Sequence, residues 1–211
     1  YTLSQAWNVQ TATYVQNVTP SPSPFGISAA YSQYFQIRHD GLGYNVINPD
    51  GTMYQYDMST QWDITSAGYS GRWLANTLTT PNTFYIGREG REIYYSNNAT
   101  IRQRSLNFKY QTSNTVSFYG NTVLVGAGPA SLGAGFYIKP DGLYMYIPDF
   151  VKGQITEHVL STPWQVQTAN IVFNDYLYTN KDGVNSPSAV FFKPDGLTMY
   201  VVNYGGTAMT P

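Results

Sequence analysis

One hairpin sequence occurs twice in this chain of 211 residues, and its repetition constrains the fold more than any other feature. KPDGLTMYVV occupies residues 193–202, and KPDGLYMYIP occupies residues 139–148. Two weaker copies follow the same pattern, IRHDGLGYNVIN at 37–48 and IGREGREIYYSN at 86–97. The four copies share a turn glycine, at Gly41, Gly90, Gly142 and Gly196. The spacings of 49, 52 and 54 residues indicate one structural unit repeated four times.

A second landmark repeats in the same phase. YTLSQAWNVQTATY at 1–14 matches YDMSTQWDITSAGY at 56–69 and HVLSTPWQVQTANI at 158–171. The fourth member, RSLNFKYQTSNTV at 104–116, aligns with Phe108 in the place of the tryptophan. The recurring tryptophans are Trp7, Trp62 and Trp164. Their recurrence predicts that these rings pack between neighbouring units, where the loss of one would cost about 3–5 kcal/mol.

Each unit is predicted to form four antiparallel strands, A to D. Strand A is short and apolar, as in GFYI at 135–138, and a Lys-Pro-Asp-Gly turn follows it, in which glycine accepts the left-handed conformation. Strand B is exemplified by 197–203 and strand C by 52–59, and strand D follows the tryptophan. Such units predict an all-β fold, a four-bladed β-propeller of four-stranded antiparallel blades. The single domain covers 1–211, with blades at about 34–82, 83–133, 134–187, and 188–211 plus 1–33.

The two ends of the chain fall within a unit. The sequence begins with a strand C and stops after a strand B, so the strand that starts at Tyr1 is expected to pair antiparallel with Met199–Asn203. One blade shared by both ends would close the ring and remove an open sheet edge. A part of a larger propeller is the alternative. The absence of an initial Met indicates a processed or excerpted chain.

Composition restricts the classes of partner. Charged residues make up only 11% of the chain and its net charge is −1, which argues against a nucleic-acid partner. No long apolar run is present, which argues against insertion into a membrane. The chain has no cysteine, so its stability must come from the packed core.

The sequence predicts no catalytic residue, no metal site and no cofactor. His39 occupies the proline position of its turn and is expected in solvent, and His158 is expected on a blade surface. No carboxylate stands at metal-ligand spacing from either histidine. NKDGVN at 180–185 lacks calcium ligands at both ends of the loop. The acids before the turn glycines are explained by hydrogen bonds to turn amides, and they are Asp40, Glu89, Asp141 and Asp195.

The repeat resembles a known class of propeller. The motifs F-x-K-P-D-G-x-x-M-Y-V and Y-x-L-S-x-x-W-D-I-x-T-A are carried by Phe191–Val201, Phe136–Ile147 and Tyr56–Ala67. They resemble the propeller repeats of virion and tail-associated proteins of bacteriophages and of some bacterial surface proteins, while 84–118 departs most from the pattern. The resemblance implies a virion or extracellular location and a non-enzymatic binding or structural role. Its implied partners are other virion or surface proteins, copies of the same chain, or host surface glycan. A carbohydrate-active propeller enzyme is the alternative function.

The candidate ligand-binding residues are aromatic and amide side chains near the long connections from strand D to the next strand A. These connections, at 17–33 and 174–187, differ in sequence, as expected of a binding face. Trp73 stands outside the repeat and is expected in a loop. The candidates are Trp73, Asn76, Tyr176, Tyr178 and Tyr204.

Basic residues concentrate in the second unit and form a candidate patch for an anionic partner. Arg102 and Arg104 alternate along one strand and are therefore expected on one face. The alternative is a solvated face that Glu89 and Glu92 partly neutralise. The patch comprises Arg88, Arg91, Arg102, Arg104 and Lys109.

Overall fold

The computed structural model describes residues 2–4, 12–13, 34–47, 52–74, 83–87, 89–97, 100–107, 109–110, 115–123, 135–178 and 186–203. Strands dominate this part of the chain, and two short 3₁₀ helices connect outer strands. Neither helix is long or apolar enough to cross a membrane.

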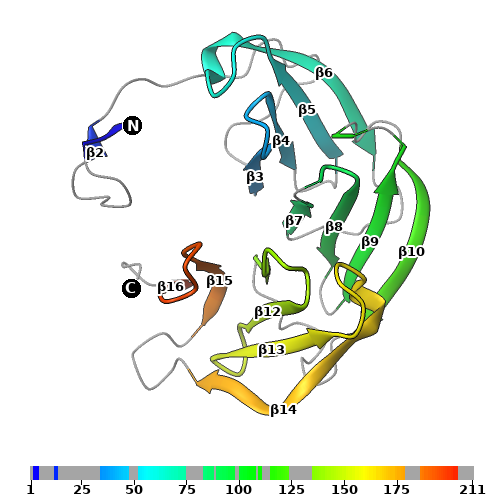
Figure 1. Cartoon of the computed structure of the whole chain (residues 1–211), viewed down its shortest axis with the longest axis vertical. Coiled ribbons are helices and arrows are strands. Elements are labelled where there is room, and N and C mark those ends of the chain that lie inside the picture. Colours follow the sequence, from blue (N-terminus) through cyan, green and yellow to red (C-terminus); the bar gives the residue numbers. More distant parts are fainter. Residues whose placement is uncertain are drawn as a thin grey trace.

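Most of the described residues lie in three four-stranded antiparallel sheets, in each of which the strands pair in chain order. The sheets follow one another around an arc, with β6, β10 and β14 on its outer side (Figure 1). The strands are β3 (Tyr34–Ile37), β4 (Gly43–Ile47), β5 (Thr52–Met58), β6 (Ala67–Leu74), β7 (Thr83–Ile86), β8 (Glu92–Asn97), β9 (Thr100–Leu106), β10 (Thr115–Val123), β11 (Tyr137–Ile138), β12 (Tyr144–Asp149), β13 (Gln154–Leu160) and β14 (Ala169–Tyr178). The predicted all-β propeller of antiparallel blades is confirmed.

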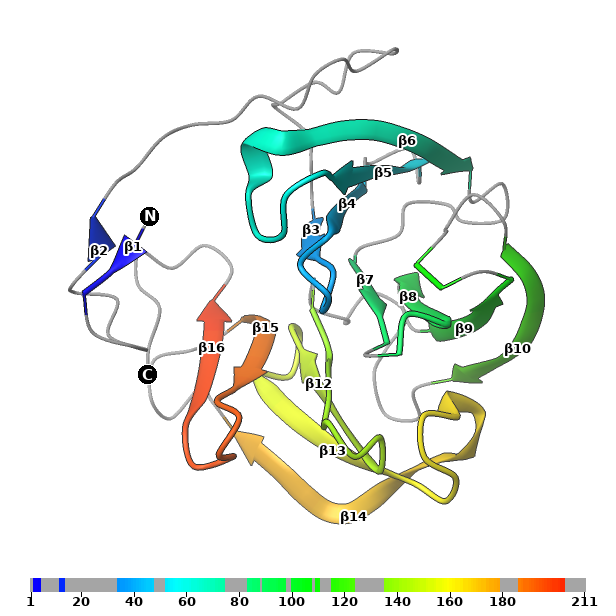
Figure 2. The ribbon, with the colours of Figure 1, turned by 45° about the horizontal axis from the view of Figure 1, so that its top comes forward.

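Two hairpins occupy the open side of the arc. β15 (Pro187–Phe192) pairs with β16 (Met199–Asn203) and packs against β12, while β1 (Thr2–Leu3) pairs with β2 (Ala12–Thr13). Figures 1 and 2 show both hairpins on the side of the ring that the three complete blades leave open, and we call this place the fourth position.

The expected pairing between the two ends of the chain is wrong for the described residues. β1 pairs with β2 and β16 pairs with β15, so the strand near Tyr1 does not extend the sheet of Met199–Asn203. The hairpin uses one edge of β1, and pairing of the other edge with β16 would have to close the longest loop in the chain.

The turns between the first two strands of each blade adopt the conformation that their sequence predicts. Each turn glycine has a φ between 67° and 74°, and its N–H donates to the carbonyl three residues earlier. In three of the turns an aspartate accepts a hydrogen bond of 2.9 Å from the N–H two residues later. Those aspartates are Asp40, Asp141 and Asp195.

An aromatic residue from the connection between the third and fourth strands covers the turn glycine in each of the three complete blades. Each of these aromatic residues has a φ between 60° and 65°, and its N–H donates to the glycine carbonyl at 2.6–2.9 Å. The ring leaves no room for a Cβ on the glycine. The pairs are Trp62 with Gly41, Tyr110 with Gly90, and Trp164 with Gly142.

These contacts correct two predictions. Trp62 is 61% exposed, so it covers a turn and does not pack between blades, although Trp164 does pack against a buried cluster. Tyr110, and not Phe108, holds this position in the second blade, because the segment aligns with its siblings without a gap. Phe108 and Trp7 lie outside the described residues.

Consecutive blades are joined by apolar clusters and by hydrogen bonds. The buried N–H of Val166 in the third blade donates to the side-chain oxygen of Gln103 in the second at 3.1 Å. The N–H of Gly135 donates to the carbonyl of Ser188 at 2.8 Å, which links the third blade to the fourth position. The cluster between the second and third blades contains Tyr94, Ile101, Phe136, Ile138, Met145, Ile147, Leu160 and Val166. These contacts fix the innermost strands around a common axis.

Candidate ligand-binding cavity on the propeller axis

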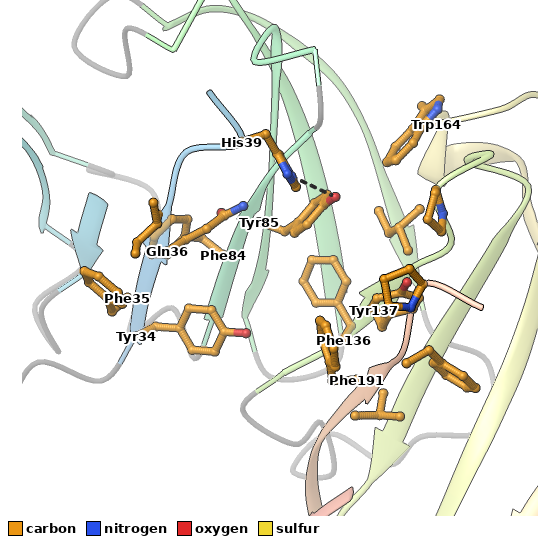
Figure 3. A pocket seen from close by; sticks show the side chains of 16 residues that line it. Tyr34, Phe35, Gln36, His39, Phe84, Tyr85, Phe136, Tyr137, Trp164 and Phe191 are labelled. Atoms are coloured by element: carbon orange, nitrogen blue, oxygen red, sulfur yellow. Dashed lines mark hydrogen bonds between the residues drawn. The ribbon is translucent and has the colours of Figure 1, made fainter. Parts of the chain in front are cut away.

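A cavity of about 580 Å³ lies where the innermost strands of the four blade positions meet, and we call it the axial cavity. Figure 3 shows side chains from β3, β7, β15 and the segment around β11 gathered around it. Its volume falls in the range of small-ligand sites. The lining residues are Tyr34, Phe35, Gln36, Ile37, His39, Phe84, Tyr85, Phe136, Tyr137, Ile138, Pro140, Trp164, Val190, Phe191, Phe192 and Pro194.

Aromatic rings dominate the lining and remain partly open to solvent. Phe35 is 47% exposed and Phe191 is 51% exposed. The ring of Tyr137 lies 5.7 Å from that of Phe191 in an edge-to-face arrangement and 5.3 Å from that of Phe192, measured between centroids. Such preformed aromatic surface inside a cavity is typical of a ligand site.

Part of the polar capacity of the axial cavity is already committed to the fold. The side-chain amide of Gln36 accepts from the N–H of Ile86 at 2.7 Å and donates to the carbonyl of the same residue at 3.2 Å. The amide of Gln36 therefore makes the two backbone hydrogen bonds that an adjacent strand would make to Ile86, and it links the first blade to the second. The imidazole of His39 and the hydroxyl of Tyr85 lie 3.5 Å apart, as the dashed line in Figure 3 shows.

A second cavity of about 570 Å³ adjoins the axial cavity, and we call it the acidic cavity. Pro140 and Trp164 line both cavities. Glu92 at the start of β8 is half-buried here, and burial raises the pKa of its carboxyl group. Arg91 opposes this rise in the pKa, whereas Glu89 adds to it. The full lining is Gly87, Glu89, Arg91, Glu92, Pro140, Pro163 and Trp164.

The predicted ligand-binding residues do not meet at one place. Trp73 lies in β6, which corrects its expected position in a loop, and Tyr176 and Tyr178 lie in β14. These are the outermost strands of two different blades. Asn76 and Tyr204 lie outside the described residues. A ligand role for the five residues stays a prediction.

The predicted basic patch is partly assembled on the second blade. Arg102 and Arg104 share one face of β9, between buried residues of the other face. The guanidinium of Arg104 and the ammonium of Lys109 lie 5.8 Å and 5.3 Å from the centroids of tyrosine rings. Arg91 lines the acidic cavity, and Arg88 lies outside the described residues. The anionic partner stays a prediction.

His158 is buried, so its predicted place on a blade surface is wrong. It lies in β13, between β12 and β14, and is 3% exposed. Its Nε2 atom lies 3.2 Å from the hydroxyl of Thr156, and burial lowers the pKa of His158 to about 4. His158 lines neither cavity. Among the described residues, no group of three or more His, Cys, Asp or Glu side chains could hold a metal ion.

The sequence carried one signal for the axial cavity. The innermost strands read FQI, FYI, FYI and VFF at 35–37, 84–86, 136–138 and 190–192. A half-buried strand normally alternates apolar and polar residues. Because successive side chains of a strand point to opposite faces of its sheet, consecutive aromatic residues place rings on both faces of the innermost strand.

No family model matches the sequence, and no curated protein matches it. Solved structures match its fold. A protein from Lactobacillus plantarum aligns with a TM-score of 0.60 and 15% identity, over 85% of this chain and 50% of that chain. A Bacteroides fragilis protein provisionally identified as a 6-phosphogluconolactonase aligns with a TM-score of 0.57 and 16% identity, over 82% of this chain and 47% of that one.

A third structure carries the fold in its description. The β-propeller domain of Cps50 (Swd1) from Myceliophteria thermophila aligns with a TM-score of 0.50 and 14% identity, over 81% of this chain and 48% of that one. The chain thus spans about half the length of these three structures. At such identities the likeness shows the fold alone, and that fold is a β-propeller.

Proposed function

We propose that this chain is a non-enzymatic binding module of a virion-associated or extracellular assembly, and that it holds a segment of a partner protein in the axial cavity. The observation that carries the proposal is the lining, in which partly exposed rings from β3 and β15 surround a preformed space. A few residues in well-packed pockets, often aromatic ones, provide most of the binding energy in protein interfaces. The location rests on the resemblance of the repeats to virion and bacterial surface propellers.

The chemistry of the axial cavity favours a protein segment over a glycan. A sugar ring carries several hydroxyl groups, and each one that is buried needs a hydrogen-bond partner. The amide of Gln36 is committed to Ile86, so the main polar groups that face the cavity are the His39–Tyr85 pair and the hydroxyls of Tyr34 and Tyr137. An apolar side chain of a bound protein segment needs no hydrogen-bonding groups in the cavity.

The same lining favours binding over catalysis. Nucleophilic and acid–base catalysis commonly uses Ser, Cys, Lys or paired carboxylates. Among the described residues that line the axial cavity there is none of these, and His39 is the one histidine. The carbohydrate-active alternative therefore has less support than binding.

Replacement of Phe191 by alanine is expected to weaken partner binding about tenfold, because it removes an exposed ring from the cavity wall. Random heptapeptides displayed on phage would be selected on the wild-type protein, and the affinity of each selected peptide would be measured for each variant. Leu177→Ala is the matched control, since Leu177 is 47% exposed on the outer strand β14. It should leave both the affinity and the melting temperature unchanged.

Two outcomes would overturn the proposal. One is that no peptide is selected. The other is that selected peptides bind Phe191→Ala and the wild type equally well. A glycan array tests the competing ligand class in parallel. If a glycan binds the wild type and this binding is lost in Phe191→Ala, the ligand of the axial cavity is a carbohydrate and not a protein segment.

A further inference from the structure

The acidic cavity indicates the charge of the partner segment, which the uncharged lining of the axial cavity does not. We propose that the partner segment places a lysine or arginine side chain in the acidic cavity, against Glu92, beside the apolar side chain that fills the axial cavity. This inference rests on the proposed function. The shared wall of Pro140 and Trp164 allows neighbouring side chains of one segment to enter both cavities.

Glu92 is not explained by the repeat. The residue two positions after the turn glycine is uncharged in the other three units, where it is Gly43, Tyr144 or Thr198. Within the described part of the chain, the carboxylate of Glu92 takes part in no hydrogen bond or ion pair. Burial of this carboxylate is costly to the fold and Arg91 offsets only part of the cost, so a bound cation would stabilise it further.

The basic residues of the neighbouring turns are already neutralised within their own blades. The guanidinium of Arg38 lies 2.7 Å from Asp40 and 2.6 Å from Asp57. The ammonium of Lys139 lies 2.9 Å from Asp141. These cations therefore do not compete for Glu92.

The charges and rings around the two cavities together attract a cation. Glu89 and Glu92 line the acidic cavity with a single described cationic residue, Arg91, which is exposed. The axial lining contains no Lys or Arg among the described residues. The faces of aromatic rings carry negative potential and attract ammonium and guanidinium groups. The surroundings are thus complementary to an apolar group joined to a base.

A matched set of small probes tests this complementarity. 2-Phenylethylammonium, 2-phenylethanol and 3-phenylpropionate share a benzene ring and differ in charge. We expect the ammonium to bind about fivefold more tightly than the alcohol, as measured by ¹H–¹⁵N NMR titration, and the carboxylate to bind most weakly. Glu92→Gln should remove the preference for the ammonium and leave the affinity for the alcohol unchanged. Arg91→Gln should have the opposite effect and strengthen binding of the ammonium.

The outcomes separate this inference from the proposed function. If the probes bind at Phe191 but the ammonium has no advantage, or if Glu92→Gln leaves its advantage intact, the cationic partner is wrong and the axial site stands. If no probe shifts the signals of residues that line the axial cavity, both proposals fail. The dipeptides acetyl-Phe-Lys-amide and acetyl-Phe-Gln-amide form a second arm. Tighter binding of the lysine peptide supports a protein partner, whereas binding of the small ammonium alone would replace it with a free amine.

Discussion

Gly142→Ala is expected to lower the free energy of unfolding by about 2–5 kcal/mol. Gly142 has a φ of 74°, a conformation that costs a residue with a Cβ about 1–2 kcal/mol. The indole of Trp164 also leaves no room for a Cβ, so the ring must move away from the buried cluster around Ile138 and Tyr94. Urea unfolding followed by circular dichroism would measure the loss.

Two other glycines serve as controls for Gly142→Ala. Gly68 lies in β6 with open space around its Cα, so Gly68→Ala should change stability by less than about 0.5 kcal/mol. Gly41 is covered by the exposed ring of Trp62, which can move into solvent, so Gly41→Ala should cost only about 1–2 kcal/mol. If Gly142→Ala costs no more than Gly68→Ala, the aromatic contact with the turn contributes nothing to stability.

The second large effect is a loss of stability in mild acid caused by His158. Burial lowers the pKa of this imidazole from 6.5 to about 4 in the folded protein. Between these two values the unfolded chain binds more protons than the folded one, so stability falls as the pH falls. The contribution is fully present above pH 6.5 and about 3 kcal/mol of it is lost by pH 4.

Variants of the two histidines isolate this effect. His158→Gln removes the titration, so the difference in unfolding free energy between pH 7 and pH 4 should shrink by about 3 kcal/mol in urea melts. His39→Gln leaves the buried imidazole of His158 in place and should therefore retain the contribution of His158 to that difference. Equal slopes for the wild type and His158→Gln would mean that His158 binds its proton as readily in the folded protein as in the unfolded chain, and is therefore not buried as described.

The repeat made the blades predictable, because turn chemistry acts locally. Lys-Pro-Asp-Gly specifies its own conformation through the aspartate acceptor and the left-handed glycine, as Gly196 with a φ of 72° illustrates. The ring that covers the turn was less predictable. Any flat aromatic side chain can cover a glycine, so identity to tryptophan is a poor guide, and the position predicted for Phe108 is held by Tyr110.

The axial cavity and the buried His158 depend on how whole blades pack, which no local pattern encodes. The apolar run around Phe191 fits a filled core as well as an open cavity, and only the spacing of four blade positions distinguishes the two. His158 matches Tyr56 in the repeat, and Tyr56 is fully buried. The expectation of a surface position assumes that this position of the repeat is exposed, whereas Tyr56 and His158 are both buried. The pairing of β1 with β2 follows from the repeat, whereas the other edge of β1 could pair with β16 only by closing the longest loop in the chain, a cost that strand sequence alone does not settle.

The axial cavity as the binding site is tested most directly by filling it. The chain has no cysteine, so Phe191→Cys introduces a single thiol into the cavity wall, and Leu177→Cys introduces one on the outer strand β14. Each variant would be alkylated with N-phenylmaleimide, and the affinity for a selected peptide would be measured before and after the reaction by isothermal titration calorimetry. We expect the adduct at position 191 to abolish binding and the adduct at position 177 to leave it unchanged. Undiminished binding with the cavity filled would contradict the account.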